Sequence, residues 1–249
     1  MKRFVALLAL SLAVFGGTEA MARDISFSSA ITQKDFRDLT RQAGAAISYK
    51  NTAPAEPLGI TGFDAGVEMS AIDISDSSYW KAAFRNDAPS FLVIPKLRAR
   101  KGLPFGIDVG AMYSYVPDSN IKLWGVELSK AILEGTVATP AVGIRATYSR
   151  LAGVNDLDLQ TAGIDASISK GFLILTPYAG VGGVWVKSEA KGNLKSLAAA
   201  AGAPLDNENV FQPRVFGGLK FTPLPLFGVT AEVEYQQRPI YSLKAALSF

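Results

Sequence analysis

The chain has 249 residues, of which 49% are hydrophobic and 19% are charged, and its formal net charge at pH 7 is +3. It contains no cysteine and no histidine, which excludes disulfides, thiolate metal sites and nucleophilic triads or dyads that depend on histidine. The nearly balanced charge implies no strongly anionic partner, so we expect the chain to bind no nucleic acid.

The first 22 residues have the pattern of a secretory signal peptide. A basic start precedes an apolar run over residues 4–15, which is too short to cross a membrane as a helix. Ala20 and Ala22 are the small residues expected for cleavage after residue 22, whereas Thr18 and Ala20 fit cleavage after residue 20. We expect residues 1–22 to be removed during export.

An amphipathic helix is predicted over roughly residues 33–46. Thr32 is a suitable N-cap, and Asp35 follows at the spacing of a capping box. The helix has one apolar face, whose residues recur at helical intervals: Phe36, Leu39, Ala43 and Ile47. Such a face has to be buried against another surface.

From residue 59 onward, apolar and polar residues alternate in ten segments, which is typical of β-strands with one face toward lipid. The segments lie near residues 63–71, 90–100, 105–115, 124–129, 142–148, 162–168, 172–186, 214–221, 227–236 and 241–249. This pattern predicts an all-β fold over residues 59–249: a closed antiparallel transmembrane β-barrel of about 10 strands, preceded by the short amphipathic helix.

The last strand carries the most specific signal. Counting back from Phe249, every second residue to Tyr241 is apolar. A final strand with a terminal aromatic resembles the assembly signal of small outer-membrane β-barrel proteins of Gram-negative bacteria, and this resemblance covers about residues 60–249. It implies a location in the bacterial outer membrane, contact with outer-membrane lipid, and recognition of the C-terminal strand by the barrel assembly machinery. It implies no substrate and no active site.

An even number of strands places both ends of the barrel on the periplasmic side, and the long connections over residues 74–89 and 187–209 on the outside. Because the linker over residues 51–58 is short, we expect the helix to cover or occupy the periplasmic mouth. Residues 23–58 would then form a plug that limits passage. A helix that faces solvent or binds a periplasmic partner is the alternative.

Charged residues on the predicted inward faces sort by strand and are candidates to line the lumen. They are Asp64, Glu68, Lys96, Arg98, Asp108, Glu127, Arg145, Asp165, Arg214, Lys220, Glu232, Glu234 and Lys244. They either form cross-strand ion pairs that fill a narrow interior or line a path for a solute or a proton. Glu232 and Glu234 are expected to interact with Arg214, Lys220 or Lys244, whereas Asp108 and Glu127, on adjacent strands, lack an equally obvious pairing across their shared boundary.

The leading functional interpretation is a non-enzymatic barrel that mediates limited passage of small solutes or binds a small-molecule ligand at the cell envelope. The alternative is a closed structural or surface-interaction barrel without a transport role. Glu232 and Glu234 could act as an acid–base pair, but their spacing of two more naturally marks one face of a strand. We therefore predict no catalytic residues, no cofactor and no metal site.

Overall fold

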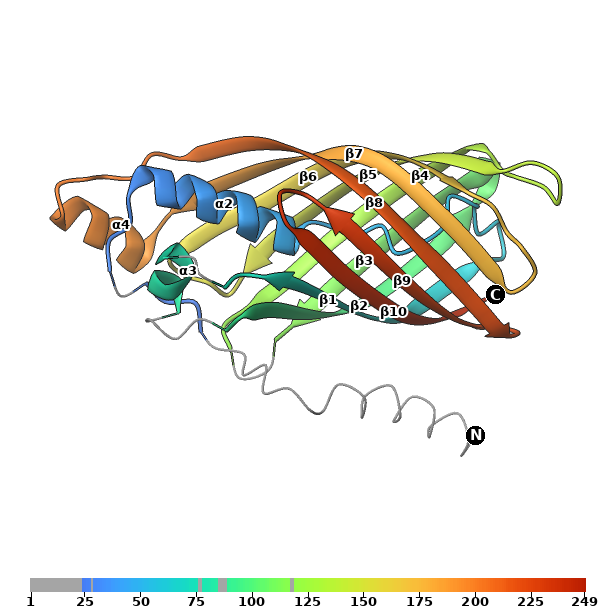
Figure 1. The fold of residues 1–249 in the computed structure, drawn as a ribbon, viewed down its shortest axis with the longest axis horizontal. Coiled ribbons are helices and arrows are strands. Elements are labelled where there is room, and N and C mark those ends of the chain that lie inside the picture. Colours follow the sequence, from blue (N-terminus) through green and yellow to red (C-terminus); the bar gives the residue numbers. More distant parts are fainter. Residues whose placement is uncertain (1–23, 28, 76–77, 85–88, 117–118) are drawn as a thin grey trace, which may run out of the picture.

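The computed structural model describes residues 24–27, 29–75, 78–84, 89–116 and 119–249. Within these residues it forms one closed barrel of ten antiparallel strands (Figure 1). The strands are β1 (Phe63–Asp73), β2 (Phe91–Leu103), β3 (Ile107–Tyr115), β4 (Lys122–Leu133), β5 (Ala141–Ala152), β6 (Leu157–Ser169), β7 (Leu175–Ala190), β8 (Glu208–Leu224), β9 (Phe227–Tyr235) and β10 (Pro239–Ser248). The predicted signal peptide, residues 1–22, lies outside the described residues.

The predicted strand number and barrel closure are confirmed. Each strand pairs with its neighbours in sequence, and β1 closes the barrel by pairing with β10, so that Asp64 lies opposite Ser248 and Ile72 opposite Ile240. Closure removes the exposed sheet edges that lipid cannot satisfy with hydrogen bonds. The described helices include none that is long and apolar enough to span a membrane.

The outer surface of the barrel is apolar. In β3, Val109 and Tyr113 are exposed, whereas Asp108, Met112 and Ser114 between and beside them are buried. Exposed apolar residues of the other strands include Val67, Leu97, Trp124, Ile144, Ile164, Val181, Val215, Val233 and Leu243. Because successive side chains of a strand point to opposite sides, one face meets lipid and the other meets the lumen. The closed barrel and its apolar surface place the protein in the bacterial outer membrane.

The two ends of the barrel differ. At one end, which we call the loop end, β1 finishes and long connections carry the helices α3 (Ser78–Ala83) and α4 (Gly192–Ala200). At the other, the turn end, β1 begins, β10 finishes, and the short turn η1 (Pro104–Gly106) joins β2 to β3. Short turns and both barrel termini are periplasmic in this class of fold, which predicts that the loop end faces outward.

The N-terminal helix α2 (Gln33–Ile47) begins where the sequence predicts. The hydroxyl of Thr32 accepts a hydrogen bond from the amide of Asp35 at 3.1 Å, and the Asp35 carboxylate accepts one from the amide of Thr32 at 3.3 Å. These reciprocal bonds form a capping box, which satisfies two amides at the helix start.

The position of α2 corrects the sequence-based expectation. It lies with α3 and α4 at the loop end (Figure 1) and not at the periplasmic mouth. Thr40 shares a 2.5 Å hydrogen bond with Ser188 of β7, and Gln212 of β8 donates to the carbonyl of Arg41 at 2.9 Å. The expectation failed because it treated the linker as a short tether. Extended residues 48–62 can reach about 50 Å, at ~3.3 Å per residue.

Candidate functional site

The lumen segment, which we define as residues 48–62, runs inside the barrel from α2 to the start of β1. Near its beginning, Lys50 Nζ donates to Glu234 Oε1 of β9 at 2.7 Å. The carbonyl of the next residue, Asn51, accepts from Arg145 Nη1 of β5 at 2.7 Å. Strands β9 and β5 are not neighbours in the barrel, so a chain that contacts inward side chains of both lies within the lumen.

The lumen segment continues to the turn end. The amide of Ala55 donates to Ser169 Oγ at the end of β6 at 3.1 Å, and the amide of Leu58 donates to Asp108 Oδ1 at the start of β3 at 3.0 Å. Both strand residues lie beside the short turns. The segment therefore occupies the lumen over most of its length, and its backbone amides form hydrogen bonds with inward side chains of the strands.

Glu68 of β1 is the centre of one buried charge cluster. It forms ion pairs with Lys96 at 3.0 Å and with Arg98 at 2.6 Å, both from β2. Thr52 of the lumen segment donates its hydroxyl to Glu68 Oε2 at 2.7 Å. The Arg98 guanidinium also lies over the ring of Tyr49, 4.5 Å from its centroid. Cation–π and charge-assisted contacts thus hold the lumen segment against two strands.

Glu127 of β4 is the centre of a second buried charge cluster. It forms ion pairs with Arg100 at 2.5 Å, Arg98 at 3.4 Å and Arg145 at 3.5 Å. Arg100 also pairs with Asp108 at 2.9 Å. Glu127 and Asp108, whose pairing was the least obvious from the sequence, therefore share Arg100 of β2 as a partner. Arg100 was missed as a lumen residue, although it continues the alternate spacing of Arg98.

The third cluster joins β6, β8 and β9 to the lumen segment. Arg214 donates through Nε to Asp165 Oδ1 at 2.6 Å and forms an ion pair with Glu234 at 3.3 Å, as the sequence suggested. Glu234 also binds Lys50, which the sequence analysis did not single out.

Glu232 differs from Glu234, two residues away on the same face of β9. It forms no ion pair with any described residue. Its carboxylate accepts from the hydroxyl of Tyr178 at 2.8 Å and from the amide of Asn51 at 3.3 Å. The expected interaction of Glu232 with a basic strand residue is therefore wrong. Tyr178 faces the lumen and Trp185 faces outward. The two residues are seven positions apart on β7, so the alternation of the strand places them on opposite faces.

The two lysines expected near the acidic pair lie elsewhere. Lys244 forms an ion pair with Asp64 at 2.9 Å across the β1–β10 seam. Lys220 is half-buried near the turn end, opposite Thr230 of β9, and makes no ion pair within the part of the chain that the structure describes. All other predicted lumen residues are buried inside the barrel.

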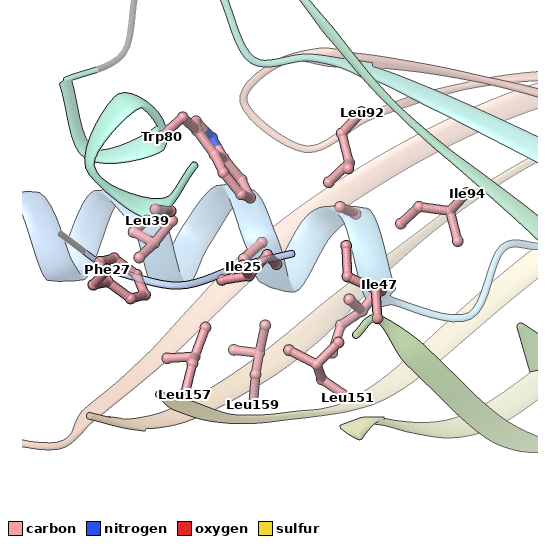
Figure 2. Close-up of a pocket in the computed structure, with 14 residues that line it drawn as sticks. Ile25, Phe27, Leu39, Ile47, Trp80, Leu92, Ile94, Leu151, Leu157 and Leu159 are labelled. Atoms are coloured by element: carbon pink, nitrogen blue, oxygen red, sulfur yellow. The ribbon is translucent and has the colours of Figure 1, made fainter. Parts of the chain in front are cut away.

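The loop-end half of the lumen is filled by apolar side chains around α2. All four predicted residues of its apolar face, Phe36, Leu39, Ala43 and Ile47, are buried. Leu39 and Ile47 of α2 lie across from Leu151, Leu157 and Leu159 of the barrel wall, and Trp80 of α3 closes the other side (Figure 2). An apolar cavity of about 20 Å³ remains between them.

Close packing fixes α2 in the loop-end mouth. Val186 of β7 occupies the space that a side chain at Gly44 would need, so the helix backbone lies directly against the strand. Trp80 Nε1 donates to Gln42 Oε1 at 2.8 Å, and Ser149 Oγ donates to the carbonyl of Ile47 at 2.9 Å. Wall and loop residues thus hold both the middle and the end of α2.

No protein-family model and no curated protein matches the sequence. Solved structures match most of the chain at low identity. The outer membrane protein OprG from Pseudomonas aeruginosa is 9% identical, with a TM-score of 0.38, and the match covers 79% of this chain and 99% of that one. The N-terminal β-barrel domain of Pseudomonas aeruginosa OprF is 14% identical, with a TM-score of 0.36 and coverage of 74% and 97%.

The attachment invasion locus protein Ail of Yersinia pestis is a third structural neighbour. It is 13% identical, with a TM-score of 0.33, and the match covers 76% of this chain and 97% of that one. These neighbours belong to the class of small Gram-negative outer-membrane barrels that the sequence resembles.

Proposed function

We propose that the protein is an outer-membrane barrel whose lumen is closed to diffusing solutes and whose loop-end helices form an interaction surface outside the cell. The observation that carries this proposal is the lumen segment, which occupies the interior from α2 to the turn end. Its residues Lys50 and Asn51 bind Glu234 of β9 and Arg145 of β5, two strands that lie four places apart in the ring of ten. This is the closed-barrel alternative of the two functions that the sequence left open.

Free energy favours the closed state. Removing one partner of a buried ion pair costs about 3–5 kcal/mol, because the other charge remains buried without compensation. Withdrawal of the lumen segment would take Lys50 from Glu234 and Thr52 from Glu68 in a single step. Passage of a small solute through the lumen, the leading interpretation from the sequence, would require this displacement.

The other functional interpretations have less support. The apolar cavity beside α2 measures about 20 Å³, and a single water needs ~10–15 Å³ on this measure, so the cavity is too small for a typical small-molecule ligand. Glu232 and Glu234, the candidate acid–base pair, are enclosed and engaged by Tyr178 and Lys50. Their contacts support a structural role over a catalytic one.

Conductance in planar bilayers tests the closed lumen. The full chain should show no sustained open level, whereas Lys50→Glu should open transient channels, because it places a second carboxylate against Glu234. Lys34→Glu makes the same charge change on the exposed face of α2 and should conduct no more than the unaltered protein. A steady open level in the unaltered protein would refute the proposal, and it would support solute passage instead.

We also propose that outer-membrane lipid and the barrel assembly machinery are partners. Tyr241, Leu243 and Leu247 of β10 are exposed on the lipid side, and Phe249 is exposed at the turn end. Deletion of Phe249 should lower the yield of heat-modifiable, membrane-inserted barrel severalfold. Phe105→Ala removes another exposed turn-end aromatic outside the C-terminal strand and is the matched control. Equal yields for the two variants would remove the special role of the C-terminal residue.

A further inference from the structure

The first described residues of the chain are attached to three separate connections at the loop end. The amide of Ile25 donates to Asn120 Oδ1 at 3.0 Å, in the connection between β3 and β4. The amide of Phe27 donates to Asp156 Oδ2 at 3.1 Å, in the connection between β5 and β6. The amide of Ser26 donates to the carbonyl of Ala83 in α3 at 2.9 Å. Residues 24–27 therefore lie at the loop end together with α2.

The barrel itself begins at the opposite end. The amide of Phe63, the first residue of β1, donates to the carbonyl of Phe249 at 2.8 Å, so the first and last barrel residues meet at the turn end. Residues 24–27 and 29–47 thus lie toward one end of the barrel, and residue 63 lies at the other. The lumen segment is the connection between them, and it passes through the barrel and not around it.

From this topology we infer that the barrel serves as the route by which its own N-terminal segment, residues 24–47, reaches the outside of the cell. The inference extends the proposed closed barrel: the lumen segment that blocks solutes is also the tether of an exported segment. The strands form a closed ring around the lumen segment. The N-terminal segment therefore crosses the membrane while the strands assemble, before the ring closes. It remains displayed in the loop-end mouth.

The lumen is chemically complementary to the tether. At Asn51, the backbone amide donates to Glu232 and the backbone carbonyl accepts from Arg145, so both polar groups of an extended residue are satisfied by inward side chains of opposite walls. Satisfaction of buried backbone groups by wall residues is what a permanently threaded chain requires, because a buried backbone group without a hydrogen-bond partner costs free energy. Lys50 also places an ammonium group beside β9, which carries two inward carboxylates, Glu232 and Glu234.

Single-cysteine labelling of intact cells tests the inference, and the chain contains no cysteine that would interfere. Three exposed positions report on three places: Lys34→Cys on α2, Lys195→Cys on α4 at the loop end, and Val137→Cys in the turn between β4 and β5. The probe is a membrane-impermeant maleimide. We expect Lys34→Cys and Lys195→Cys to react in intact cells, and Val137→Cys to react only after the outer membrane is permeabilised, with at least a fivefold rise.

The outcomes separate this inference from the proposed function. If Lys195→Cys reacts in intact cells but Lys34→Cys reacts only after permeabilisation, the N-terminal segment is periplasmic and the inference fails, while the outward loop end stands. If Val137→Cys reacts in intact cells and Lys195→Cys does not, the orientation is inverted and both fail. A Thr40→Cys/Ser188→Cys variant adds a second readout. If α2 is docked against β7, the oxidised variant should run as a cross-linked species. Failure to form this cross-link would also count against the inference.

Discussion

The lumen has two halves that are filled by opposite chemistry, although the same strands line both. In the loop-end half, inward residues such as Leu123, Leu159 and Val186 are apolar and pack against a helix. From the middle of the strands to the turn end, which is the charged half, inward residues such as Glu68 and Arg214 are charged and surround an extended chain. A helix forms its backbone hydrogen bonds internally and needs only an apolar surface to pack against. An extended chain has unpaired backbone groups, which the side chains of the wall must bind.

This difference predicts different responses to mutation. The loss of one apolar contact removes transfer free energy and leaves a void, and the neighbours can partly relax. The loss of one member of an ion pair leaves a charge buried, and no relaxation compensates it. Damage to the charged half should therefore weaken the barrel as a whole, and damage to the apolar half should loosen α2 first.

The largest effect is expected for Arg214→Met in the charged half. It removes the partner of Asp165 and one partner of Glu234, and should lower the free energy of unfolding by about 3–5 kcal/mol. Urea unfolding of the barrel refolded in detergent measures this loss. Lys220→Met, on the same strand but without an ion pair to a described residue, is the control and should cost less than about 1 kcal/mol. Equal losses for the two variants would contradict the importance of the cluster.

A smaller and more local effect is expected for Leu39→Ala in the apolar half. Leu39 is buried beside an existing cavity, so the docking of α2 should weaken by about 3 kcal/mol. Hydrogen exchange should accelerate in the amides of α2 while the strand amides keep their protection. Lys34→Ala on the exposed face of the same helix should leave exchange nearly unchanged. Faster exchange throughout the barrel would show that the two halves are not independent.

The smallest effect is expected for Glu232, a carboxylate of the charged half that forms no ion pair with a described residue. Glu232→Gln keeps the acceptor for Tyr178 and should change the free energy of unfolding by less than about 1 kcal/mol. Glu234→Gln, two residues away, removes the counter-charge of buried Lys50 and should cost more. Comparative urea unfolding of the two variants decides the point, and a larger loss for Glu232→Gln would refute this view of the acidic pair.

The sequence predicts the lipid-facing half of the architecture well, because alternation is a direct consequence of strand geometry. All ten strands are found, but the loop-end extensions of several were missed. The sixth strand was predicted from about residue 162, whereas β6 begins at Leu157. Its inward Leu157 and Leu159 receive α2, whereas Asp158 and Gln160 lie on the opposite face, so the alternation there is the reverse of the one expected for a strand in lipid.

The candidate site was only partly predictable. Arg100 shares the spacing of Lys96 and Arg98, and strict use of that spacing would have found it. The partners of Glu127 come from β2 and β5 at once, and such convergence depends on barrel diameter and strand tilt, which no single strand encodes. Lys50 stands in a segment without periodicity, so nothing in the sequence indicated that it binds Glu234.

The seam between β1 and β10 has a consequence for the speed of folding. Ser248 donates to Asp64 across this seam, and the two residues are separated by 184 positions in the chain. Such a non-local pairing is the slow kind of contact, because the entropy of closing a long loop is lost before the contact forms. The other strands can pair through short hairpins beforehand. The half-formed sheet, with its two free edges, should therefore be the longest-lived and most aggregation-prone species during folding.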